Sequence, residues 1–234
     1  MPAGRGSWSR PSLPTADLGT QARSFAQEVT SLLNATITDG VTFSAIIGNQ
    51  AGTLLLGRGV TKTNLDPQAV PLTLGRRSPS AWLWLAFVLG PDPEGEHLTV
   101  LKSGFALYAD PDRDRMMLHY DYEREPEHSY PPAHVQVHGI SEGLSDLSER
   151  RSGQRKDLKD FHFPVGGRRY RPSIEDVIEF LVAEDLADAR PGWHEAVVDS
   201  RCRWEDRQLR AAVRRNPGLA LDQLRRDGVV SRAN

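Results

Sequence analysis

The chain has 234 residues, a formal net charge of −2 and 38% hydrophobic residues, values that suit one globular domain with a small appendage. The near-neutral balance excludes a global field that draws the chain to nucleic acid or membrane, and the lone Cys202 excludes an internal disulfide. The longest apolar run, residues 81–89, is shorter than the roughly 20 residues that a membrane-spanning helix needs, so we expect a cytoplasmic protein with no membrane partner.

The N-terminal part of the sequence predicts a disordered segment followed by one helix. Residues 1–14 are rich in Gly, Ser and Pro, a composition typical of disorder. Apolar residues then recur at helical spacing from Leu18 to Leu33. Thr15 or Asp17 can cap the start of this helix, and Asn34 can end it.

From about residue 36 to residue 139 the pattern predicts strands. Residues 41–57 indicate two strands around an Asn-Gln-Ala-Gly turn, and residues 60–80, with three prolines, indicate a loop. Residues 81–89 are apolar throughout, which favours a central strand covered on both faces. Further strands are expected within residues 97–109, 115–123 and 133–140. Together they predict an antiparallel meander of five to seven strands.

The C-terminal part predicts helices. The polar residues 141–160 indicate a linker or flexible loop, and Ser173 with Asp176 has the spacing of a capping box at a helix start. A second helix is expected from about Trp193 to Arg215, and a short third one at residues 219–226. We therefore predict an α+β fold, with an N-terminal helix and a C-terminal helical segment on one sheet face and the other face partly open. The expected division is residues 15–190 as the α+β domain and 191–234 as a helical extension.

Residues 128–139 hold three of the seven histidines, behind Pro131 and Pro132. The Val-x-Val alternation predicts a strand on which His134, Gln136 and His138 share a face. The Cα atoms of His134 and His138 would then lie ~13 Å apart, too far for an easily shared metal ion. We therefore expect neither a metal nor a cofactor.

The preceding strand extends this polar face. His119, Asp121 and Glu123 alternate with apolar residues, and matching the apolar faces predicts His119 opposite His138, Asp121 opposite Gln136 and Glu123 opposite His134. Imidazoles beside carboxylates suit general acid–base catalysis near neutral pH. The candidate catalytic residues are His119, Asp121, Glu123, His134 and His138. The alternative is an ordinary solvent-facing sheet surface with stabilising cross-strand pairs.

Arginines just before the helix predicted to start at Ser173 form a candidate phosphate site. Arg168, Arg169 and Arg171 follow a Gly-Gly pair and precede a helix N-terminus, where backbone amides can hold an anion. The alternative is a tight turn that leads into a capped helix. His162, between two phenylalanines, is expected to be a packed strand residue, and the arginine-rich residues 201–226 suit either RNA or DNA contact or a solvated helix.

Residues 118–139, "LHYDYEREPEHSYPPAHVQVHG", resemble the core of the TumE-like family of toxin–antitoxin proteins. The matching positions are Tyr120, Asp121, His128, Pro132, His134 and His138. The final histidines are four residues apart and the chain is much longer than that family's, and both features depart from its pattern. The resemblance implies a prokaryotic toxin–antitoxin setting with a cognate antitoxin, and says less about chemistry.

Two functions of different classes remain open at this point. One is a metal-independent nuclease, or toxin-like protein, that acts on RNA through the His/Asp/Glu sheet face. The other is a non-catalytic interaction protein, antitoxin-like or the partner of a mobile element, that docks through the sheet face or the arginine-rich tail.

Overall fold

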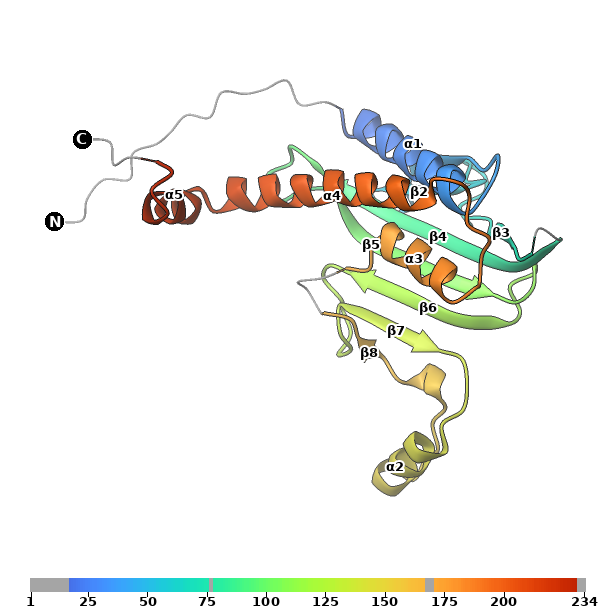
Figure 1. Cartoon of the computed structure of the whole chain (residues 1–234). Coiled ribbons are helices and arrows are strands. Elements are labelled where there is room, and N and C mark those ends of the chain that lie inside the picture. Colours follow the sequence, from blue (N-terminus) through green and yellow to red (C-terminus); the bar gives the residue numbers. More distant parts are fainter. Residues whose placement is uncertain (1–16, 76–77, 167–170, 231–234) are drawn as a thin grey trace.

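The computed structural model describes residues 17–75, 78–166 and 171–230, and the predicted disordered segment 1–14 lies outside them. The fold is α+β, as predicted, with one antiparallel sheet and helices against it (Figure 1). None of the helices in the described ranges has the length and apolar character needed to cross a membrane.

Within the described ranges the sheet has eight strands, slightly more than the five to seven predicted. They are β1 (Phe43–Ile47), β2 (Leu54–Arg58), β3 (Val70–Thr73), β4 (Pro79–Pro91), β5 (Leu98–Tyr108), β6 (Met116–Glu123), β7 (Ala133–Val137) and β8 (Phe163–Pro164). The order is β1-β2-β4-β5-β6-β7-β8, and β3 pairs with β4 beyond the end of β2. The loop expected at residues 60–80 therefore contains β3, whose proline, Pro71, is tolerated beside a single partner strand.

The helices are α1 (Leu18–Thr36), α2 (Glu142–Ser152), α3 (Ile174–Ala183), α4 (Trp193–Arg215) and α5 (Pro217–Arg226), with a 3-10 turn, η1, at Leu158–Asp160. Asp17 caps α1 by accepting from the Gly19 amide, and Ser173 with Asp176 forms the predicted capping box of α3. Thr15 lies outside the described residues. Asn34 does not end α1. It lies within the last turn and bonds both backbone groups of Val41.

The prediction of a linker at residues 141–160 is wrong, because α2 and η1 lie there. The signals for α2 are at its ends: Glu142 in the first turn, Arg150 and Arg151 in the last, and Gly153 with a φ of 71° after it. These charges match the helix dipole, and the left-handed glycine terminates the helix. The few apolar residues of α2 give no strong apolar face for a periodicity test to find.

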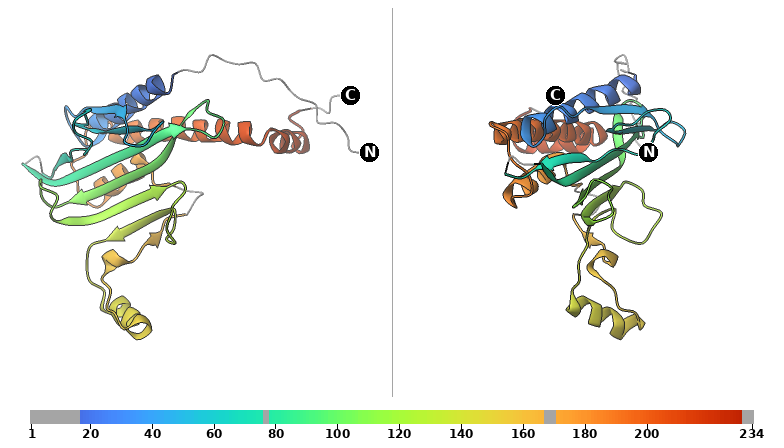
Figure 2. Two further views of the ribbon diagram at one scale, coloured as in Figure 1. Left: turned by 180° about the vertical axis from the view of Figure 1, so that it is seen from behind. Right: turned by 90° about the vertical axis from the view of Figure 1, so that its right-hand side faces the viewer.

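The core lies between one face of the sheet and helices α1, α3 and α4 (Figures 1 and 2). On β4, Leu83, Leu85 and Phe87 are buried on this face, whereas Trp82 and Trp84 point the other way and are half-buried. The expectation that β4 is covered on both faces holds only in part, because no helix lies on its outer face and the side chains there are half-buried. The expected one-sided packing of helices is confirmed.

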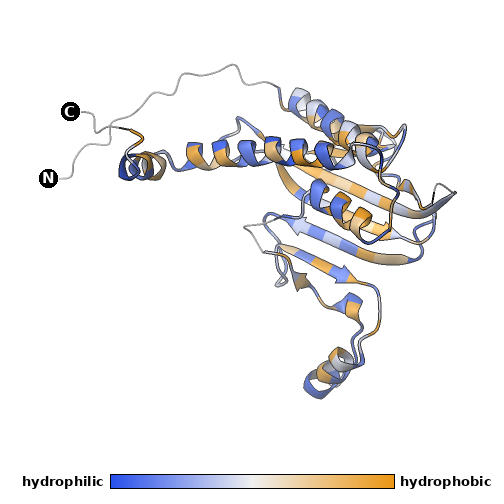
Figure 3. Ribbon diagram, in the orientation of Figure 1, coloured by the Kyte–Doolittle hydropathy of each residue, from blue (hydrophilic) through white to orange (hydrophobic). Residues whose placement is uncertain are grey.

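Helix α4 joins the core at its start and then extends beyond the sheet with α5 at its end (Figure 1). Val197, in its first turns, is fully buried. Farther along, Leu209 is 65% exposed and Leu219 of α5 is 73% exposed. Figure 3 shows apolar residues recurring along this outer part of the two helices.

Candidate active site

The open face of β6 and β7 carries the predicted polar residues. Leu118 and Tyr120 of β6 pack against the core, so the alternating His119 and Asp121 project from the face without helices. His134, opposite Asp121, shares that face, and the His138 ring lies 6.0 Å from the His119 ring between centroids. The shared face is therefore as predicted.

The predicted register is wrong by two residues. His119 pairs with Gln136 and Asp121 with His134, whereas Glu123 pairs with Lys102 of β5 and forms an ion pair with it. A shift of two leaves every side chain on its original face, because side chains alternate with a period of two. The hydrophobic alternation therefore selects the face but cannot distinguish these two registers.

Asp121 lies between two imidazoles. Its Oδ2 is 3.2 Å from His119 Nε2 and 3.8 Å from His134 Nε2. His134 is only 4% exposed, and its Nδ1 donates to the carbonyl oxygen of Pro131 at 2.9 Å. That bond fixes the ring of His134 with Nε2 toward the carboxylate.

A second chain of bonds orients His119. The carbonyl oxygen of Lys159 in η1 accepts from Gln136 Nε2 at 2.5 Å, which leaves Gln136 Oε1 to accept from His119 Nε2 at 2.7 Å. We assign the Nε2 proton of His119 on this basis, because both Gln136 Oε1 and Asp121 Oδ2 are acceptors. The bond with Asp121 raises the pKa of His119 above its usual 6.5, against the opposing effect of burial.

The pKa values of His138 and His162 are shifted in the opposite direction. Burial, and then the charge of His119, lower the pKa of His138 below 6.5. Burial and the neighbouring His134 likewise lower the pKa of His162. The face therefore combines a histidine that favours its cation with two that favour the neutral form, which is the arrangement that acid–base chemistry at one pH requires.

An aromatic stack borders these groups. Tyr130 stacks on His162 with centroids 4.4 Å apart and planes 9° apart, and on His128 at 4.9 Å. His134 meets the edge of Tyr130 at 5.0 Å. Five of the seven histidines thus gather on one side of the sheet: His119, His128, His134, His138 and His162.

The predicted phosphate-binding arginines do not form part of this cluster. Arg171 lies on the opposite, helix-covered side, where its guanidinium is 5.9 Å from the centroid of the Tyr122 ring. The sheet separates it from His119, so Arg171 cannot contact a group bound at the histidines. Arg168 and Arg169 lie outside the described residues. Glu123 is on the open face but is engaged by Lys102.

Two contributors to the site were missed from the sequence: Tyr130, which sits in a connecting loop, and Lys159, whose positive charge adds to the lowering of the pKa of His138. Gln136 was placed on this face, but its bond with the backbone of η1 was not predicted. Lys159 is exposed and belongs to the segment expected to be a flexible loop. His162 is packed, as expected, but against Tyr130 and His134 rather than in the hydrophobic core. The one sequence signal for the position of His162 was the Phe-His-Phe alternation. It places the His162 side chain on the other face of the strand from the two phenylalanine rings.

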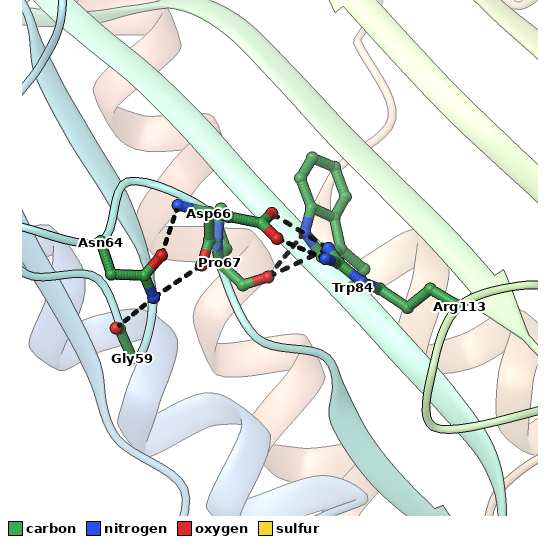
Figure 4. Close-up of polar contacts among 6 residues, drawn as sticks. All are labelled: Gly59, Asn64, Asp66, Pro67, Trp84 and Arg113. Carbon is green, nitrogen blue, oxygen red and sulfur yellow. Dashed lines mark hydrogen bonds and ion pairs between the residues drawn. The ribbon is translucent and has the colours of Figure 1, made fainter.

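A strap, residues 59–69, covers the other part of the open face (Figure 4). Trp84 Nε1 donates to the carbonyl oxygen of Pro67 at 3.0 Å, and Arg113 Nη1 donates to Asp66 Oδ1 at 3.0 Å. Gly57 lies beneath the strap, because a Cβ there would be 2.7 Å from Pro67. The strap leaves β6 and β7, which carry the histidines, uncovered.

Trp84 also forms a wall of the site. An ideal Cβ on Gly104 would lie 2.8 Å from Cζ3 of Trp84 and 3.4 Å from Oδ1 of Asp121. Gly104 therefore allows the indole to approach β5 closely beside the carboxylate. The result is an apolar surface next to Asp121.

Among the described residues, no group of three or more His, Cys, Asp or Glu side chains is arranged to hold a metal ion. Comparisons with protein-family models, with curated proteins and with solved structures found no match.

Proposed function

We propose that the open face cleaves RNA by general acid–base catalysis without a metal ion. The observation that carries the proposal is the His119–His138 pair, 6.0 Å apart between ring centroids, with pKa values displaced in opposite directions. Two imidazoles at this separation can flank one phosphodiester, one accepting and one donating a proton.

In the proposed reaction, neutral His138 takes the proton of a ribose 2′-hydroxyl. The 2′-oxygen attacks the adjacent phosphorus, and protonated His119 gives its Nδ1 proton to the departing 5′-oxygen. That nitrogen lies 3.1 Å from Met116 Sδ, a weak acceptor, whereas Nε2 stays bonded to Gln136 and Asp121. The products are a 2′,3′-cyclic phosphate and a 5′-hydroxyl end. Asp121 and Gln136 position His119 by holding its Nε2–H, and Lys159 supplies positive charge near the phosphate.

The setting that we propose is a toxin-like protein of a prokaryotic toxin–antitoxin or defence cassette, restrained by a cognate antitoxin. Its support is the resemblance of residues 118–139 to the TumE-like family. In that setting the protein acts in the cytoplasm, on cellular RNA.

Cleavage of single-stranded RNA by the purified protein tests this function. We expect His119→Ala and His138→Ala each to lower the rate by about 10²–10⁴-fold, the usual contribution of a general acid or base. The matched control is His194→Ala, an exposed histidine at the start of α4, which should cleave at the wild-type rate. EDTA should not change the rate, and a 2′-deoxyribose at the cleavage site should block it. Products ending in a 3′-hydroxyl would contradict the proposed chemistry.

The second candidate function is a non-catalytic interaction protein. The observation that favours it is the outer part of α4 with α5, where Leu209 and Leu219 are largely exposed beside several arginines. Apolar side chains exposed together typically mark a contact surface. If the wild type cleaves no RNA and does not inhibit growth when expressed alone, this function replaces the nuclease.

A further inference from the structure

A hollow lies on the helix-covered side of the sheet, on the opposite side from the histidines. It lies between α1, α4, the start of α3 and the sheet, offers about 40 Å³ of space and is open to solvent on one side. Its walls are largely apolar, with Phe25 from α1, Phe87 from β4 and Phe105 from β5. This space suits a small polar group such as a carboxylate and is too small to enclose a whole small molecule.

Two buried hydrogen-bond donors border this hollow without a partner. Arg171 Nη1 and Trp204 Nε1 are buried and have no hydrogen-bond acceptor among the described residues. The third such atom, Ser103 Oγ, lies on the same side of the sheet, on the strand position opposite Tyr122. Buried donors are almost always satisfied, because leaving one unpaired is costly. Their concentration here indicates a missing acceptor.

The positive charge of Arg171 is also uncompensated by direct contact. Burial lowers its pKa to about 10, so the guanidinium is still charged at neutral pH. Within the described ranges, none of the ion pairs involves Arg171. Glu175 acts on the Arg171 charge only at a distance, because its Oε1 accepts from Ser200 Oγ at 2.5 Å, and Glu28 pairs with Arg207.

We propose that the hollow binds a small carboxylate with an apolar chain, whose oxygens accept from Arg171 Nη1 and Trp204 Nε1. The chain of the ligand leaves the hollow along its open side, past Phe25. Both donors are covered in the present structure, so the guanidinium and the indole must rotate slightly to admit the carboxylate. A carboxylate is favoured over a neutral acceptor because it also compensates the buried charge.

Octanoate is a suitable probe, and its matched control ligand is 1-octanol, which has the same chain without the charge. The readout is the set of indole N–H signals in ¹H–¹⁵N NMR spectra of the full chain, which has five tryptophans. Trp204→Phe assigns the relevant signal. We expect octanoate to move the Trp204 signal saturably, and 1-octanol to bind at least tenfold more weakly. Acetate, which lacks the chain, should also bind at least tenfold more weakly.

Arg171→Met should weaken octanoate binding at least tenfold. Its control is Arg203→Met, the same substitution at an exposed position of α4, which should bind like the wild type. Equal affinity for octanoate and 1-octanol, or a Trp204 signal unmoved at millimolar octanoate, would overturn the proposal. If Arg171→Met does not fold, the comparison of octanoate with 1-octanol on the wild type still tests the proposal. RNA cleavage does not enter this test, so the nuclease proposal can fail independently.

Discussion

Asp121 organises the open face at the scale of single residues. It is shared by a half-buried histidine and a buried one, and it acts on them differently. His119 also receives support from Gln136, whereas His134 is tied to the backbone at Pro131. The carboxylate therefore has two roles, favouring the cation of His119 and facing the second ring nitrogen of His134.

Asp121→Asn should lower the pKa of His119, because the bond with the carboxylate is the largest cause of its elevation. A histidine with a raised folded-state pKa stabilises the protein below its unfolded pKa, about 6.5, and this stabilisation is lost as pH rises through the folded value. The variant should therefore lose most stability in mild acid and little in alkali. NMR titration of the His119 ring and urea unfolding across pH measure both effects. A pKa of His119 that stays raised in the variant would contradict the role given to Asp121.

The purified protein should contain no stoichiometric zinc. His119 Nε2 is engaged by Gln136 and Asp121, and His134 Nδ1 donates to the carbonyl oxygen of Pro131, so neither nitrogen is free to bind a metal ion. Elemental analysis of protein purified without chelators measures this. Zinc at one equivalent, lost in the His134→Ala/His138→Ala variant, would show that the cluster rearranges around a metal.

At the scale of elements, the close contact between β5 and its neighbour β4 explains one residue choice. It pairs with β4 on one side and β6 on the other, and its glycine accommodates a tryptophan from β4. The close contact explains why a strand interior, where glycine is ordinarily unfavourable, contains Gly104.

Gly104→Ala should destabilise the protein by about 1–3 kcal/mol, because the added methyl group overlaps the rigid Trp84 ring. The control is Gly143→Ala in α2, where nothing lies within 4 Å of the new Cβ. Alanine there should be neutral or stabilise by up to about 1 kcal/mol, since it favours helix over glycine. Chemical unfolding measures both. Equal stability of the two variants would show that Trp84 yields without cost.

At the scale of the whole molecule, the two sides of the sheet carry different groups. The helix-covered side holds the core and the hollow beside Arg171, and the open side holds the histidines and the strap. The helical extension expected at residues 191–234 is not uniform, because its beginning belongs to the core and its later part does not.

Val197→Ala and Val213→Ala compare these two parts of α4 with the same substitution. Val197 is fully buried, so its truncation should cost about 1–3 kcal/mol through lost burial and a residual cavity. Val213 is 45% exposed, and its truncation should change stability by less than about 0.5 kcal/mol. Urea unfolding measures both. A large loss at Val213 would show that another surface covers the outer part of α4.

The local patterns in the sequence were sufficient for much of the fold and for the polar face. Periodicity located α1 and α4, the Ser173–Asp176 spacing identified the start of α3, and alternation placed His119, Asp121 and His134 on one side. These features depend on residues close together in the chain, which is why they can be predicted without a structure.

Other features depend on contacts between distant parts of the chain. The register of β6 with β7 differs by two residues from the prediction, since alternation leaves such shifts undetermined. The position of Arg171 depends on which side of the sheet α3 packs, and the orientation of His119 depends on a backbone oxygen of η1. The sequence by itself determined which side chains share a face. Only tertiary packing decided which of them meet, because that choice depends on the relative placement of whole elements.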